Sequence, residues 1–281
     1  MNLPPSSPTD LLRQWLRVAS AWSLGWAQVV HLGAQILVLA LSPSSYRRAQ
    51  RPVLVHSLYR ATRPLLQSFT WLSALVALVI IRIVVATSLT YGLSRFALDV
   101  LVRTLVLELI PLSAALVVAV RFSLAAGDEV RALRAAGGFE AQLKRGLDPT
   151  RDIVLPRVLA SCFAVITLAL LSSVITLVLT YLSVYGFALW GVDAFTRAVG
   201  QVFNPVIGLI FLMKTVFFAL AVAVIPMVTT PRELTAQAAS LRATSASASA
   251  SARAPADLTR LARLLAVIML IEVMSLVGNY Y

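Results

Sequence analysis

The chain has 281 residues, of which 59% are hydrophobic and only 13% are charged. Ordinary soluble domains have roughly 45–50% apolar and 25% charged residues, so this composition excludes a soluble globular protein and indicates an integral membrane protein. The net charge of +12 comes mostly from arginines in short loops and at the ends of apolar runs, a pattern typical of membrane topology and not of nucleic-acid binding.

Residues 1–64 are predicted to form an amphipathic N-terminal region, in which Thr9 or Asp10 can cap the first helix. Residues 24–41 are apolar enough to span a membrane, but their polar side chains share one face. That pattern favours a helix that lies in the membrane interface over one that crosses the bilayer. The following segment, residues 42–63, holds five arginines and no acid, so we expect it on the cytoplasmic side.

Five apolar runs are predicted to span the membrane and to form one helical domain over residues 65–281. They cover about residues 66–91, 96–125, 156–189, 205–228 and 261–277. Five crossings from a cytoplasmic N-terminus place the C-terminus outside. The Ser/Ala-rich stretch within residues 230–257 is typical of a flexible linker. The sequence therefore predicts an all-α integral membrane protein.

Charged residues within these runs are the best candidates for a functional site, because a charge in the bilayer is costly unless it faces protein or water. Glu108 in the second run, Lys214 in the fourth and Glu272 in the fifth lie deep in apolar sequence. Pro111 removes a backbone hydrogen bond beside Glu108 and could form a cavity wall. Glu108 and Lys214 could line a substrate cavity, or they could be a structural ion pair between two helices.

Several enzyme classes are excluded by the residues that the chain lacks. Without a Gly-Lys dipeptide there is no phosphate-binding loop of the ATPase type. His31 and His56 are the only histidines, both before the first predicted span, and Cys162 is the single cysteine. We therefore expect no catalytic residue, no metal site and no cofactor in this chain.

Residues 127–150 form a charged island between the second and third runs and are predicted to fold as two short helices. The first starts at Asp128 and ends at the Gly137-Gly138 pair, and the second covers residues 139–144. The first is amphipathic, so it either lies on the bilayer surface or docks into a partner's groove. Its candidate contact residues are Asp128, Glu129, Arg131, Leu133 and Arg134.

The order of these features resembles the MlaE/YrbE family of ABC-transporter permeases, the membrane subunits of MCE-linked lipid transport systems. The matching elements are HSLYR at 56–60, Glu108-Leu109-Ile110-Pro111, Arg121 followed by Glu129, Leu147-Asp148-Pro149, Pro156-Arg157 and the run from Met213 to Phe218. The resemblance covers roughly residues 31–280.

The resemblance implies a bacterial inner-membrane protein with an interfacial N-terminal helix and five membrane helices, working as a dimer of permeases. It implies that the island is a coupling helix seated on a separate ATPase, which binds ATP and magnesium. It also implies a periplasmic MCE-domain partner and a phospholipid or similar hydrophobic substrate. Arg121, Asp148, Pro149 and Arg157 are expected to serve structure and topology.

Two other functions compete with this interpretation. Glu108 and Lys214 would also suit a secondary transporter that works alone with an ion gradient. An intramembrane enzyme acting on lipid is the weaker alternative, because the polar residues within the runs are few and scattered.

Overall fold

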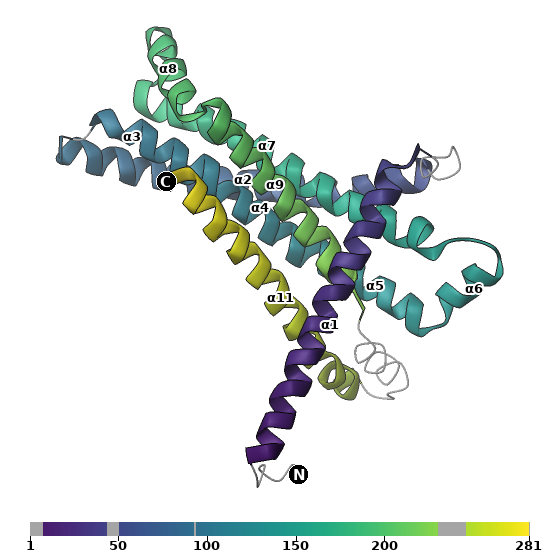
Figure 1. The fold of residues 1–281 in the computed structure, drawn as a ribbon. Coiled ribbons are helices and arrows are strands. Elements are labelled where there is room, and N and C mark those ends of the chain that lie inside the picture. Colours follow the sequence, from purple (N-terminus) through teal and green to yellow (C-terminus); the bar gives the residue numbers. More distant parts are fainter. Residues whose placement is uncertain (1–7, 44–50, 93, 230–245, 281) are drawn as a thin grey trace.

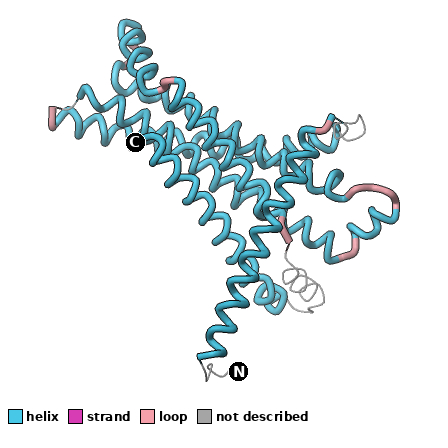
Figure 2. Tube along the Cα trace, viewed as in Figure 1, coloured by secondary structure: helices cyan, strands magenta, loops and turns pink. Residues whose placement is uncertain are grey.

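The computed structural model describes residues 8–43, 51–92, 94–229 and 246–280, with side chains at 25–43, 51–92, 97–229 and 258–278. Within these ranges the chain is helical, with short turns and no strand (Figure 2). Five helical segments are long and apolar enough to cross a membrane. The prediction of an all-α membrane protein is thus confirmed.

The elements follow one another in a simple order. They are α1 (Pro8–Leu41), α2 (Arg51–Thr90), α3 (Ser94–Leu101), the π-helical η2 (Val102–Leu109), α4 (Ile110–Val118), the π-helical η3 (Ala119–Ser123), α5 (Leu124–Ala135), α6 (Gly138–Lys144), the π-helical η4 (Thr150–Val154), α7 (Leu155–Tyr185), the 3₁₀ turn η5 (Leu189–Gly191), α8 (Val192–Val202), α9 (Pro205–Val224), the 3₁₀ turn η6 (Ile225–Met227) and α11 (Ala246–Tyr280).

The long helices lie side by side as a bundle, and α1 crosses them at an angle (Figure 1). The connections that contain α3 and α8 lie at one end of the bundle, and α5 and α6 lie at the other (Figure 1). The main core is rich in fully buried alanines, including Ala61 of α2 and Ala160 and Ala164 of α7. Small side chains let helix backbones approach closely, which is how helices associate in lipid.

Two helices are longer than the apolar pattern predicted. α2 begins at Arg51, so most of the arginine-rich segment 42–63 is helical and Pro64 lies inside the helix. α11 begins at Ala246, so residues 246–257 of the expected linker form its first turns, while residues 230–245 lie outside the described residues. Arginine and alanine are strong helix formers, and both segments continue into an apolar helix.

The connection between α7 and α9 contains a helix, α8, that the sequence analysis did not predict. α9 then begins sharply at Pro205, because Asn204 Oδ1 accepts a hydrogen bond from the N–H of Ile207 at 2.9 Å. In α1, the apolar part Gly25–Leu41 is shorter than the five spanning segments. Its position in the membrane interface stays a prediction.

Candidate functional site

Three charged side chains from three different elements meet inside the bundle, and we call them the charge cluster. Lys214 of α9 pairs with Glu108 of η2, and its Nζ lies 2.9 Å from Oε2 of Glu272 in α11. The side chains are 1% exposed for Lys214, 12% for Glu108 and 13% for Glu272. The ammonium also lies 5.7 Å from the ring centroid of Phe218. The cluster therefore joins three spanning segments.

Pro111 explains why a backbone carbonyl joins the charge cluster. In an α-helix the N–H of residue 111 would bond to the carbonyl of Leu107, but proline has no N–H to donate. Lys214 Nζ donates to this carbonyl instead, at 3.2 Å. Here the helix is also wound more loosely, since the Ile110 N–H bonds to the carbonyl of Leu105. π-turns of this kind are frequent at functional sites.

The structure brings Glu108 and Lys214 together as an ion pair, which is compatible both with a substrate cavity and with a structural pair between two helices. Sequence reasoning noticed Glu272 as a charge in the last span but did not join it to the pair. Its only signal was its depth in an apolar run, which says nothing about the direction in which the side chain points. The cluster can hold three spans together, and once opened it can offer a cation and two carboxylates to a polar substrate group.

The charged island differs from its prediction in one respect. It is not a separate helix that starts at Asp128, because α5 begins at Leu124 and follows η3 directly. The Leu124 N–H bonds to the Ala119 carbonyl, so the second span runs unbroken into the island over Ala97–Ala135. The end of α5 agrees with the prediction: Gly137 adopts a positive φ of 76°, and α6 follows.

This continuity changes the surroundings of Arg131. It was expected as a contact residue of a short amphipathic helix, yet its side chain is only 2% exposed and pairs with Asp128 one turn earlier. Asp128 also accepts a hydrogen bond from Arg260 Nη1 of α11 at 3.0 Å, and the Arg260 side chain is 4% exposed. Asp128 therefore binds α5 to α11 through Arg260, and the half of its side chain that stays exposed faces a possible partner.

Arg134 and Leu133 lie near the end of α5 and differ in what they contact. Arg134 donates a hydrogen bond to Thr229 Oγ1, just after η6, and its guanidinium lies 4.5 Å from the ring centroid of Phe139. Through these two contacts the Arg134 side chain joins α5 to α6 and to the residues that follow η6. Leu133 is exposed and remains available for a partner.

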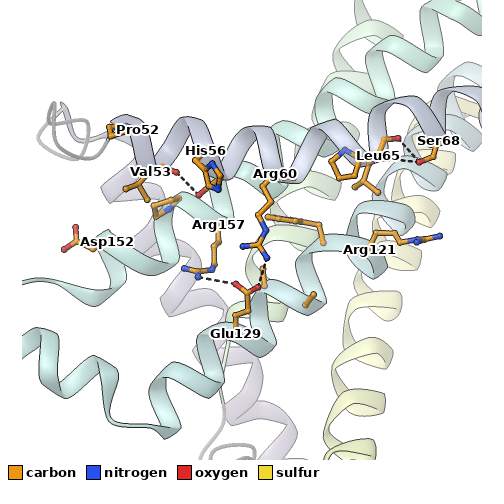
Figure 3. Close-up of a pocket in the computed structure, with 17 residues that line it drawn as sticks. Pro52, Val53, His56, Arg60, Leu65, Ser68, Arg121, Glu129, Asp152 and Arg157 are labelled. Carbon is orange, nitrogen blue, oxygen red and sulfur yellow. Dashed lines mark hydrogen bonds and ion pairs between the residues drawn. The ribbon is translucent and has the colours of Figure 1, made fainter.

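Glu129 faces a cleft of about 970 Å³ between the start of α2, the η3–α5 junction and the η4–α7 junction. It accepts hydrogen bonds from Arg60 and Arg157, each at 3.3 Å (Figure 3). Arg121 lines the same cleft and lies apart from this trio (Figure 3). We call this cavity the arginine cleft.

Asp148 and Pro149 form the turn that returns the chain to the membrane. The Asp148 carboxylate accepts a hydrogen bond from the Thr150 N–H at 3.0 Å, and its carbonyl accepts one from the Asp152 N–H at 3.0 Å. Pro149 is buried and directly precedes η4. Both residues thus start the helix that leads into α7. Among the described residues, no group of histidines, cysteines and acids could hold a metal ion.

A bundle with five apolar segments of spanning length, joined by buried charges, defines a multi-pass helical membrane protein. The family model described as Permease MlaE matches residues 54–252, and the chain belongs to this family of ABC-type permeases. The match includes Glu108, Glu129 and Lys214 and ends before Glu272. No curated protein matches the chain. The resemblance seen in the sequence is confirmed over this range.

Proposed function

We propose that the chain is the membrane subunit of an ABC-type transporter that moves phospholipid, or a similar hydrophobic substrate, between the bacterial inner membrane and a periplasmic MCE-domain partner. A separate ATPase binds ATP and magnesium and drives the movement, and two permease copies work as a dimer. Membership of the permease family supports this proposal. The arginine-rich ends of the spans support a cytoplasmic N-terminus and a periplasmic C-terminus.

One observation carries the proposal: a single continuous segment, Ala97–Ala135, holds Glu108 inside the bundle and Asp128 and Glu129 at its charged end. A partner that pushes on α5 therefore acts on the same helix that forms the charge cluster. Exposed apolar residues near this end, such as Leu133 and Leu143, suit contact with a protein surface. We assign the ATPase contact to α5, α6 and the turn after them.

The substrate contact is assigned to the charge cluster. Lys214 is enclosed by Glu108, Glu272 and the Leu107 carbonyl, so a phosphate group reaches it only when at least one of these contacts opens. A phosphate that replaces a carboxylate on the ammonium keeps the charge paired while the helices separate. In this proposal Pro111 forms the adjacent wall and keeps the Leu107 carbonyl free of a helical N–H.

The proposal is tested by purifying the tagged chain from its native host in mild detergent and identifying the proteins that accompany it. We expect an ABC ATPase and an MCE-domain protein. Glu129→Lys should release the ATPase and abolish ATP-dependent transfer of labelled phospholipid in proteoliposomes. The control Asp193→Lys, at an exposed position of α8 at the opposite end of the bundle, should keep both. Absence of an ATPase, together with flux driven by an ion gradient in the chain alone, would instead establish a stand-alone transporter.

A further inference from the structure

The arginine cleft has an amphipathic lining. Its charged wall holds Arg60 of α2 and Arg157 of α7, with Glu129 of α5 between them (Figure 3). Its other wall includes Leu65 and Phe122, which lie where α2 and the second span enter the bundle core. A cavity with cations at one side and apolar groups at the other fits a molecule that has an anionic head and a hydrocarbon body.

The charges of the cleft favour an anion. At its charged wall two arginines, Arg60 and Arg157, face one acid, Glu129, which leaves one positive charge in excess (Figure 3). Arginine is suited to phosphate because its planar guanidinium offers N–H groups in a fork that matches two phosphate oxygens. Arg60, Arg157 and Glu129 come from three separate elements, α2, α7 and α5, so the fold and not one local motif brings them together.

The arginines keep donors for a ligand after their internal bonds are counted. Each guanidinium has five N–H groups. Glu129 uses one from Arg60 and one from Arg157, and Arg157 gives one more to the Ile153 carbonyl at 2.8 Å. The two contacts with Glu129 are 3.3 Å long, beyond the roughly 2.7–2.9 Å of strong charge-assisted hydrogen bonds. Glu129 therefore holds the two cations in place without saturating them.

We propose that the arginine cleft binds the headgroup of an anionic phospholipid from the adjacent leaflet. The phosphate lies between Arg60 and Arg157, and the glycerol and upper acyl chains lie against Leu65 and Phe122. Basic pockets between membrane helices at the headgroup level recognise lipid in this way. This site is separate from the charge cluster, and it does not depend on which molecule the protein transports.

The test uses the full-length chain alone, purified in detergent and exchanged into mixed vesicles of phosphatidylglycerol and phosphatidylcholine. Native mass spectrometry then counts the lipids that stay bound. We expect the wild type to retain phosphatidylglycerol and the Arg60→Gln/Arg157→Gln variant to bind it at least about tenfold more weakly. Arg63→Gln is the matched control, since Arg63 is close to Arg60 on α2 but lies over the Tyr59 ring and does not line the cleft. Equal retention by the double variant and the wild type, or an equal loss in Arg63→Gln, overturns the proposal.

Glu129→Gln gives a result of opposite sign, so the proposal stays testable if the double variant does not fold. Removing this carboxylate frees two guanidinium donors, and phosphatidylglycerol should bind several-fold more tightly. If Glu129→Gln binds phosphatidylglycerol as the wild type does, or more weakly, the proposed lipid site is contradicted. Inorganic phosphate at millimolar concentration should not displace the lipid; full displacement would assign the cleft to a free phosphate ion. These measurements need no ATPase, so they stand even if no ATPase co-purifies with the chain.

Discussion

Lys214 and Glu272 meet at 2.9 Å across α9 and α11, although the same lysine also pairs with Glu108 from the second span. One ammonium group therefore serves two carboxylates inside an apolar bundle. Desolvation of buried charges is offset only when the opposite charges remain close. Both buried carboxylates, of Glu108 and Glu272, therefore depend on Lys214 for their opposite charge.

Lys214→Met is expected to destabilise the protein by about 3–5 kcal/mol, because it leaves two buried acids without their cation. Thermal unfolding in detergent measures the loss. The variant Glu108→Gln/Lys214→Met/Glu272→Gln should regain most of the stability, since it removes all three charges together. If the triple variant is stable but inactive in transport, the cluster acts on substrate; if it is stable and active, the cluster is a structural lock.

Gly127→Ala is expected to destabilise the contact between α5 and η6 by about 1–3 kcal/mol. A Cβ at this position would overlap the carbonyl oxygen of Pro226, and backbone must move to make room. Gly200→Ala in α8 is the control, because no atom lies within 4 Å of its added Cβ. That substitution should be neutral or slightly stabilising, as alanine favours a helix. Equal melting temperatures for both variants would contradict the close packing at Gly127.

Asp128→Asn should destabilise the protein by about 1.5–3 kcal/mol, the range for hydrogen bonds to a charged group. The carboxylate is shared by Arg131 and Arg260, whose side chains are almost completely buried. The loss should appear as faster proteolysis near the start of α11, in addition to a lower melting temperature. Glu140→Gln on the exposed face of α6 should leave both measurements unchanged.

Ala164→Leu should destabilise the core of the bundle by about 1–3 kcal/mol, because Ala164 is fully buried in the main core and a larger side chain there overpacks it. The neighbouring Phe163 is exposed and faces away from the core. Phe163→Leu should therefore change the unfolding temperature little. An unchanged unfolding temperature in Ala164→Leu would mean that α7 packs less closely than the structure shows.

The apolar runs were enough to predict five spans, because backbone groups in lipid must be bonded internally and long helices satisfy this need. They could not give the ends of α2 and α11, where arginine and alanine continue a helix beyond its apolar part. α8 was missed for a related reason: it is short and amphipathic, and it lies within a connection.

The site was predicted unevenly. Glu108 and Lys214 stood out because charges in apolar runs are costly, but the run positions do not tell which way each side chain points. The contact of Glu272 with Lys214 was therefore found only in the structure. Arg131 was expected on a surface because the island was treated as a separate helix. Its burial follows from the unbroken helix, which turns this residue inward beside Asp128.

The second span, α9 and α11 are tied together at two levels. At the charged end, Gly127 packs against Pro226, and Asp128 holds Arg260; within the bundle, Lys214 gathers the same three segments. The three segments are thus held in register by contacts at two depths. They cannot slide past one another while these contacts persist. A displacement of α5 must therefore either break one of the contacts or move all three helices as a rigid body.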